Sequence, residues 1–254
     1  MGEGKRSMIV EKSMSDGWLS NTYLLADRPG GKAVLIDTGG PMGPIVHKLE
    51  SLRLELTYVL CTHHHIDHVQ FNDAYRDRFG CPVCGHRNER ELFGRLDQQL
   101  EDGDELVVGD LHIRALLTPG HTVGQLAYLV NEQRVFTGDT LFRRTVGGTV
   151  GPGHASFEDL QYSIMDILMR LPHGTEVYPG HTDSSTIGEE WEQNPFIRTW
   201  RGLDTASERP CTVGGQPASL LLEAPDYDGG TKCWVRFDEG QRLAVVGGSR
   251  VQQR

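Results

Sequence analysis

One short stretch constrains what this chain can be. Residues 61–68 read Cys-Thr-His-His-His-Ile-Asp-His, which places four histidines and one aspartate within six residues. The stretch directly follows the apolar and β-branched run Leu56–Leu60. A strand that ends in such a cluster brings several nitrogen and oxygen donors to one point on a rigid edge, as a metal site requires. These residues therefore predict a metal centre at the end of a buried strand.

The spacing within the cluster predicts two sets of ligands. His63 and His65 lie on the same side of an extended segment, because side chains in a strand repeat every second residue. Asp67 and His68 fall where the chain turns into a helix that we expect to end at Gly80, so they are free to face a second ion. The plain alternative is a solvated polar loop or an expression tag, but tags are terminal.

The same type of side chain follows further strand-like runs downstream. His121 stands in Thr-Pro-Gly-His-Thr, Asp139 in Phe-Thr-Gly-Asp-Thr and His181 in Pro-Gly-His-Thr. A single histidine after Pro-Gly is usually a loop residue. Two such copies and a Gly-Asp, together with the histidine cluster, favour one shared metal site.

Composition bounds the function class. A net charge of −10 argues against a nucleic-acid or anionic-membrane surface, both of which need clustered Lys and Arg. No apolar run approaches the roughly 20 residues that span a bilayer, and residues 1–8 lack the apolar core of a signal peptide. Five cysteines without a pairing pattern fit a reducing compartment. We therefore expect a cytoplasmic protein that acts on a small molecule.

The remaining pattern predicts two β-rich halves with helices. Residues 90–100 are expected to form a short helix. A longer helix should start at a Ser156–Asp159 capping box and bury Phe157, Leu160 and Ile164. Asp37, at the end of a predicted strand, is either an acid that orients a ligand histidine or a turn residue. The other expected strands cover residues 21–26, 33–37, 106–108, 111–117, 125–130 and 134–136.

Cys81 and Cys84 form a C-x-x-C pair that a motif search would assign to a metal knuckle or a redox pair. No second cysteine pair follows at finger spacing, and Pro82-Val83-Cys84 reads as a short buried strand. We interpret both cysteines as core residues.

The T-H-x-H-x-D-H pattern at Thr62–His68 resembles the metallo-β-lactamase superfamily, and within it the glyoxalase II-like hydrolases. The resemblance implies an α/β fold, the four-layer αββα sandwich, over residues 1–205. It also implies that one metal binds to His63, His65 and His121 and a second to Asp67, His68 and His181, with Asp139 as the bridge. The ions would be divalent, with Zn expected first and Fe or Mn as alternatives.

A closer resemblance to the small glyoxalase II-related hydrolases runs from Gly138-Asp139-Thr140-Leu141-Phe142 to Asn194-Pro195-Phe196. Those relatives usually carry Arg-Thr-Asp after the glycine that follows Leu-Phe, whereas this chain has Gly148-Thr149-Val150. The usual substrate loop is therefore altered. Arg143 and Arg144 are candidate substitutes, although an extended segment would point them to opposite faces.

Past Trp200 the composition changes. Residues 208–210 resemble a linker, and short strands separated by Gly-Gly pairs follow, so residues 206–254 are expected to form a small β-rich extension. It is either a packing or dimer-contact module, which leaves a homo-oligomer open, or a lid over the active site.

The resemblance and the ligand types together favour a dinuclear metal-dependent hydrolase of thioesters such as hydroxyacyl-glutathione. Two ions activate a shared water as hydroxide and polarise the carbonyl, while Asp67 and Asp139 position the water and take its proton. A lactonase or β-lactamase-like hydrolase, a persulfide dioxygenase with one iron, and a nucleic-acid processing protein remain alternatives.

Overall fold

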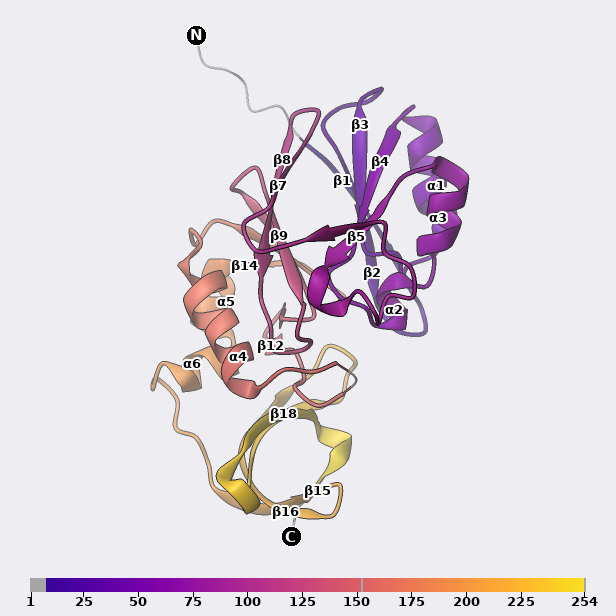
Figure 1. Cartoon of the computed structure of the whole chain (residues 1–254). Coiled ribbons are helices and arrows are strands. Elements are labelled where there is room, and N and C mark those ends of the chain that lie inside the picture. Colours follow the sequence, from indigo (N-terminus) through magenta and orange to yellow (C-terminus); the bar gives the residue numbers. More distant parts are fainter. Residues whose placement is uncertain (1–7, 152, 254) are drawn as a thin grey trace.

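The computed structural model of the chain describes residues 8–151 and 153–253. Two six-stranded sheets pack face to face, helices cover the outer face of each, and a smaller five-stranded sheet lies at one end (Figure 1). This arrangement confirms the predicted αββα sandwich with a β-rich C-terminal extension. The expected lack of a signal peptide concerns residues 1–7, which lie outside the described residues.

The first sheet takes the strands in chain order. They are β1 (Ile9–Met14), β2 (Asn21–Ala26), β3 (Lys32–Ile36), β4 (Glu55–Leu60), β5 (Val83–His86) and β6 (Gln98–Leu100). Its outer face packs on α1 (Met42–Ser51) and α3 (Asn72–Phe79), with Ile45, Leu49 and Tyr75 buried between helix and sheet. Gly80 ends α3 in the left-handed conformation with φ 67°, as expected of a C-terminal glycine. The short α2 (Ile66–Val69) follows the histidine cluster.

The second sheet has the order β14-β13-β10-β9-β8-β7. Its strands are β7 (Glu105–Val108), β8 (Leu111–Leu117), β9 (Leu126–Val130), β10 (Arg134–Gly138), β13 (Glu176–Pro179) and β14 (Ser185–Thr186). The helices on its outer face are α4 (Phe157–Tyr162), α5 (Ile187–Gln193) and α6 (Pro195–Trp200). The Ser156–Asp159 capping box is present at the start of α4, as predicted.

The core between the sheets fixes how they face each other. Tyr23 of the first sheet meets Phe136 of the second edge to face, with ring centroids 5.2 Å apart, and Tyr178 stacks on Phe136 at 4.8 Å. Aromatic pairs in these geometries add to the free energy gained from area burial. The same core includes Cys84, whereas Cys81 packs beneath the helices of the first sheet. Both cysteines are buried, as the sequence predicts.

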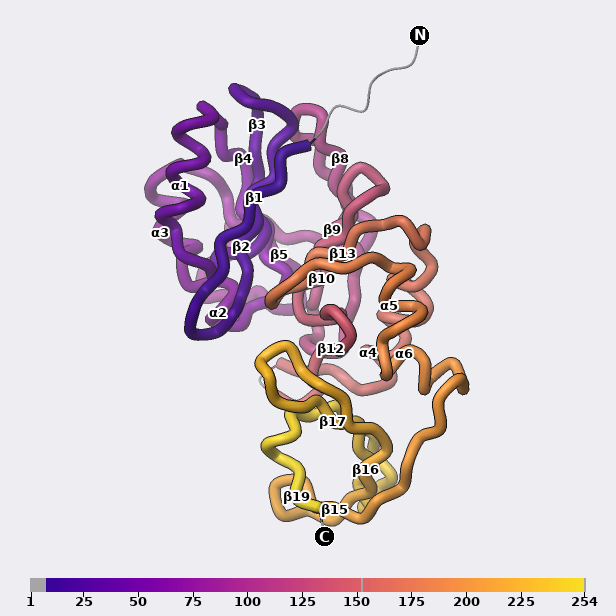
Figure 2. The backbone as a smooth tube through the Cα atoms, turned by 180° about the vertical axis from the view of Figure 1, so that it is seen from behind, coloured from indigo at the N-terminus to yellow at the C-terminus, as the bar shows by residue number. Residues whose placement is uncertain are grey.

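The C-terminal sheet has the order β18-β17-β16-β15-β19. Its strands are β15 (Arg209–Val213), β16 (Gln216–Pro225), β17 (Thr231–Phe237), β18 (Leu243–Gly247) and β19 (Val251–Gln253). One face joins the core under α4, where Trp234 stacks on Phe157 at 5.5 Å and Val245 is fully buried. The tube in Figure 2 shows the turn between β16 and β17 rising towards the hairpin that ends at β12 (Thr145–Val146).

Two local predictions are wrong. Residues 90–97 form turns, and Gln98–Leu100 is strand β6, because Leu100 buries its side chain between the sheets. Residues 209–210 are not a linker, because they open β15 and pair with Ser219 and Leu220. Residues 143–144, for which the sequence left an extended conformation open, form the turn between β11 (Leu141–Phe142) and β12.

The longer helix predicted to start at the Ser156–Asp159 capping box is interrupted. α4 continues as a π-helical turn at Ser163–Ile167 and a 3₁₀ turn at Leu168–Arg170. Its predicted apolar face still packs on the second sheet through Leu160, Ile164 and Leu168. Among the described residues, no helix combines the length and the apolar character that crossing a bilayer requires.

Candidate metal centre

The predicted ligand residues lie just past the carboxyl ends of four strands, at one end of the sandwich. The histidine cluster follows β4, His121 follows β8, Asp139 follows β10 and His181 follows β13. β10 and β13 are parallel neighbours, with Phe136 opposite Tyr178, so the ends that carry Asp139 and His181 meet at the same edge. Strands far apart in sequence thus bring seven candidate ligands together.

His63, His65 and His121 form the first group. His65 Nδ1 lies 3.1 Å from His63 Nε2 and 3.0 Å from His121 Nε2. The three nitrogens lie within 4.8 Å of one another, a separation that one ion can span. The alternate spacing of His63 and His65 therefore brings them to one point, as the sequence predicts.

Asp67, His68 and His181 form the second group. His68 Nε2 is 3.3 Å from His181 Nε2 and 3.3 Å from Asp67 Oδ2. Asp67 and His68 both lie in α2, which begins directly after His65. His68 also forms a potential ligand group with His63 and Asp139, so the two groups lie next to each other.

Asp139 lies between the groups. Its Oδ2 is 3.5 Å from His121 Nε2 and 3.3 Å from His181 Nε2, and its Oδ1 is 3.4 Å from His68 Nε2. One carboxylate therefore touches histidines of both groups. Gly180 allows this approach, because a Cβ at that position would lie 2.2 Å from Asp139 Oδ1.

In three of the five candidate ligand histidines, the ring nitrogen far from the cluster lies beside an oxygen acceptor. His68 Nδ1 lies 3.0 Å from Asp37 Oδ2, His121 Nδ1 2.9 Å from the Gly148 carbonyl and His181 Nδ1 3.0 Å from the Trp18 carbonyl. Acceptors of this kind orient metal-binding histidines. The Nε2 atoms of these three rings are thereby directed into the cluster.

The close approach of these ring nitrogens tests whether a metal fits. His121 Nε2 and His65 Nδ1 lie 3.0 Å apart, His68 Nε2 and His181 Nε2 lie 3.3 Å apart, and buried Asp139 Oδ1 has no hydrogen bond to any described residue. The donors are imidazoles and carboxylates with no thiolate, a set suited to zinc, iron or manganese. The residues fit two divalent ions, with no residue missing from either group.

Electrostatics prepares the same residues for a cation. Burial holds the pKa of His63 well below its ordinary value and lowers that of His121 to about 4, so both rings are neutral at pH 7. Burial alone would raise the pKa of Asp139, but His181 and His68 bring it well below its usual range. Neutral His63 and His121 beside an ionised Asp139 are the protonation states that metal binding needs. Burial would lower the pKa of His68, but Asp139, Asp37 and Asp67 bring it well above its ordinary value, so metal binding there releases a proton.

The comparison with known proteins agrees with this geometry. Residues 15–181 match the sequence profile of the Metallo-beta-lactamase superfamily. The chain belongs to this superfamily. An uncharacterized protein of Mycobacterium tuberculosis is 38% identical to it, over 70% of this chain and 92% of the relative.

Two further relatives carry more descriptive names. The probable polyketide biosynthesis zinc-dependent hydrolase BaeB of Bacillus velezensis is 33% identical over 71% of this chain and 81% of its own. The crystal structure of ETHE1 from Myxococcus xanthus superposes with a TM-score of 0.67 at 34% identity, covering 76% of this chain and 85% of that one. The profile match stops at residue 181, so the C-terminal sheet lies outside it.

Asp37 takes the first of its two predicted roles. Its Oδ1 accepts a hydrogen bond from the Thr62 backbone N–H at 2.7 Å, and its Oδ2 accepts one from the Thr62 hydroxyl at 2.8 Å. The same Oδ2 faces His68 Nδ1. Asp37 thus fixes both the start of the superfamily motif and one of its ligand rings.

His64, the second histidine of the cluster, points elsewhere. His64 Nδ1 lies 2.9 Å from Glu89 Oε2, which also accepts from the His64 backbone N–H, while Glu89 Oε1 accepts from the Gly124 N–H. Glu89 is fully buried and links the histidine loop to the loop before β9. The sequence analysis missed Glu89, because it lies in a polar stretch that resembles a surface turn.

Tyr227 was also missed. It lies in the turn between β16 and β17, flanked by Asp226 and Asp228, which in sequence reads only as a solvated turn. In the structure its ring stacks on His181 with centroids 4.4 Å apart and an interplanar angle of 12°. The C-terminal sheet thus reaches a candidate ligand of the metal centre.

Arg143 and Arg144 both contact acidic residues around α5. Arg143 Nε lies 3.4 Å and Arg144 Nη2 3.5 Å from Glu189 Oε1, and Arg144 Nη2 also bonds Gln193 at 2.6 Å. Opposite faces were expected only for an extended segment, but these residues form a turn, which brings both side chains to one carboxylate. Their role in substrate binding stays a prediction.

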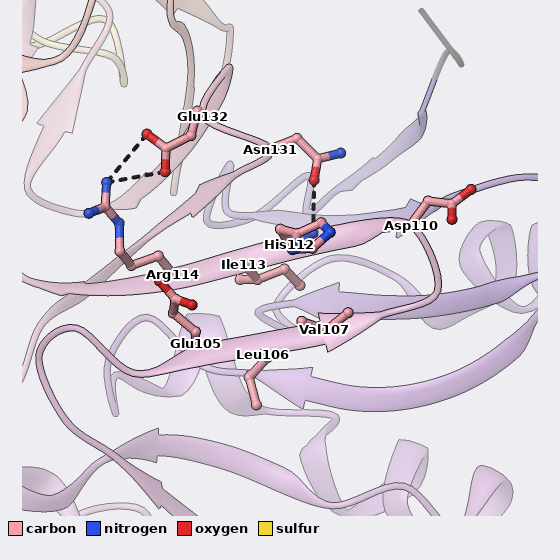
Figure 3. Close-up of a pocket in the computed structure, with 9 residues that line it drawn as sticks. All are labelled: Glu105, Leu106, Val107, Asp110, His112, Ile113, Arg114, Asn131 and Glu132. Atoms are coloured by element: carbon pink, nitrogen blue, oxygen red, sulfur yellow. Dashed lines mark hydrogen bonds and ion pairs between the residues drawn. The ribbon is translucent and has the colours of Figure 1, made fainter. Parts of the chain in front are cut away.

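A cavity of about 500 Å³ lies away from the superfamily site, along β7 and β8 (Figure 3). Its polar groups are engaged with each other: Arg114 pairs with Glu132, and the His112 backbone N–H donates to Asn131. None of its lining residues belongs to a ligand group. The cavity is therefore not part of the candidate metal centre, which the histidine cluster forms.

Proposed function

We propose that the chain is a hydrolase that carries two divalent metal ions, zinc first among them, and cleaves thioesters. The observation that carries the proposal is the position of Asp139, whose carboxylate touches His121 of one ligand group and His68 and His181 of the other. A carboxylate shared in this way suits a bridge between two ions. The name of BaeB, a zinc-dependent hydrolase, supports zinc and hydrolysis.

When bound, the two ions supply a nucleophile by lowering the pKa of water towards about 7, and they polarise the substrate carbonyl. The chain holds them with His63, His65 and His121 on one side and Asp67, His68 and His181 on the other. Asp67 Oδ2 and both oxygens of Asp139 are acceptors within the cluster, so they orient the attacking water and take up its proton. Asp37 and the Gly148 and Trp18 carbonyls hold three of the ligand rings in place.

Thioesters suit this set of groups. The leaving thiolate has a conjugate-acid pKa of about 8.5, so it departs without a strong general acid. Lactones and β-lactams have poorer leaving groups and are secondary candidates in the same class.

One alternative has a specific observation behind it. His63, His68 and Asp139 also form a fully buried group of two histidines and one carboxylate. That is the ligand set of many mononuclear non-haem iron oxygenases. A persulfide dioxygenase with one iron is therefore the second candidate.

The test is a substrate panel on protein purified without added chelator. Thioesters, lactones, a β-lactam and glutathione persulfide are compared, with thiol release, acid release from the ring-opened lactone and β-lactam, and oxygen uptake as readouts. Thiol release from a thioester that is abolished by chelator and restored by zinc supports the proposal. Oxygen uptake with the persulfide, together with no thioester turnover, would contradict the proposed thioester hydrolase and support the persulfide dioxygenase.

A further inference from the structure

The C-terminal sheet contacts residues next to the metal centre at two places. The Thr149 backbone N–H donates to the Val245 carbonyl at 2.9 Å, and the Val245 N–H donates to the Thr149 hydroxyl at 3.0 Å. Thr149 directly follows Gly148, whose carbonyl faces His121 Nδ1. The loop that departs from the small glyoxalase II-related pattern is thus paired with a strand of the extension.

The second place is the turn that carries Tyr227. Lys232 Nζ lies 3.0 Å from Asp226 Oδ2, in a nearly buried ion pair, and its ammonium sits 5.5 Å from the Tyr227 ring centroid. Phe142 packs against the turn, and its ring centroid lies 4.8 Å from that of Tyr227. A buried pair and an aromatic contact hold the turn where Tyr227 meets His181.

Tyr227 lies against the candidate ligand groups, because its ring stacks on His181 with centroids 4.4 Å apart. Burial raises the pKa of Tyr227, and Asp139, Asp226, Asp67 and Asp228 raise it further. A phenol is protonated at pH 7, since its ordinary pKa is about 10, so it offers an O–H donor there.

The surroundings of Tyr227 are poor in unpaired positive charge. Lys232 is paired with Asp226, and Arg143 and Arg144 share the Glu189 carboxylate, with Asp183 Oδ2 a further 4.0 Å from Arg143 Nη1. Exposed apolar side chains come instead from segments next to ligand residues: Ile66, 63% exposed, stands between His65 and Asp67, and Trp18 is 45% exposed. Such a rim favours an uncharged, apolar substrate arm over a dicarboxylate such as glutathione.

We infer that Tyr227 is a substrate-contacting residue contributed by the C-terminal sheet, and that it helps select thioesters with an uncharged thiol arm. Its ring forms a wall beside His181, and its hydroxyl donates a hydrogen bond to the bound substrate. The substrate part of this inference rests on the proposed thioester hydrolysis.

The experiment compares wild type with Tyr227→Phe, Tyr227→Ala and the control Tyr162→Phe, whose ring is 59% exposed on α4. The substrates are S-lactoylglutathione and the S-lactoyl thioester of N-acetylcysteamine, which share the acyl group but differ in charge. We expect wild type to favour the uncharged ester in kcat/KM. Tyr227→Phe should lower kcat/KM for the uncharged ester about 3- to 10-fold, because one hydrogen bond is lost, and should leave the zinc content unchanged. The control should match wild type.

A second readout needs no turnover. Cobalt-loaded protein is titrated with N-acetylcysteamine while the visible absorption of the bound cobalt is followed. Tyr227→Ala should shift the starting spectrum and weaken thiol binding at least about fivefold, and Tyr162→Phe should change neither. If wild type hydrolyses no thioester, the proposed function fails, and this titration still decides the role of Tyr227. Unchanged spectrum and thiol affinity in Tyr227→Ala, or equal turnover in Tyr227→Phe and wild type, would overturn the inference.

Discussion

Asp37 Oδ2 lies 3.0 Å from His68 Nδ1, although the two residues are 31 positions apart in the chain. The same carboxylate binds the backbone and the hydroxyl of Thr62, so one buried acid positions the histidine loop and a ligand ring together. Carboxylates in this position raise the basicity of the histidine and fix its tautomer.

The first prediction is that Asp37→Asn weakens metal binding about 10- to 100-fold while the protein stays folded. The amide keeps the size of the side chain but removes the charge that faces His68. Chelator competition measures the zinc affinity, and Asp77→Asn, at an exposed position on α3, is the control. Equal affinities in the two variants would reduce Asp37 to a turn residue.

The second prediction concerns Asp139→Ala. The variant should lose metal and activity and keep its far-UV circular dichroism, because the cores on both faces of the sheets do not include this residue. Elemental analysis after gel filtration reads out the metal. Full metal content with wild-type turnover would show that Asp139 is not a metal ligand.

The third prediction is that Glu89→Ala destabilises the fold by about 2–4 kcal/mol, because it leaves the buried N–H groups of His64 and Gly124 without an acceptor. Urea unfolding measures this change, and exposed Glu91→Ala is the control. No loss of stability would mean that solvent replaces the carboxylate.

The same residue gives a pH dependence with a definite sign. Burial would raise the pKa of Glu89, but His64 and the Gly124 N–H hold it below the ordinary value. A depressed pKa contributes stability above the unfolded pKa of about 4.3 and loses it as the pH falls through the folded pKa. The stability gap between wild type and Glu89→Gln should therefore narrow in acid.

The fourth prediction is that Cys81→Ser with Cys84→Ser leaves the metal content unchanged and costs some stability. Both thiols are buried, and burial raises the pKa of Cys84 to about 12, so neither is a thiolate at neutral pH. Serine places a hydroxyl in apolar surroundings, at a cost of about 1–3 kcal/mol per site. Loss of metal in this variant would instead support the interpretation of Cys81 and Cys84 as a metal knuckle.

The sandwich and the ligand groups were predictable because they depend on local signals. Each ligand follows a strand-like run, and parallel strands such as β10 and β13 align their carboxyl ends. The helix expected at 90–100 failed because burial of Leu100 between the sheets overrides a local helical pattern. The roles of Glu89 and Tyr227 could not be predicted from the sequence, because each residue lies in a polar turn and its contacts are more than 20 residues away in the chain. The domain boundary at residue 205 stays a prediction.

The central claim is a dinuclear site that hydrolyses thioesters, and one measurement tests it most directly. Metal is titrated into chelator-treated protein while bound metal and thiol release from an uncharged thioester are recorded on the same samples. The account predicts that thiol release reaches its plateau at two equivalents of zinc per chain and that Asp139→Ala stays inactive throughout. One tightly bound ion per chain, with no gain in activity from a second equivalent, would contradict it.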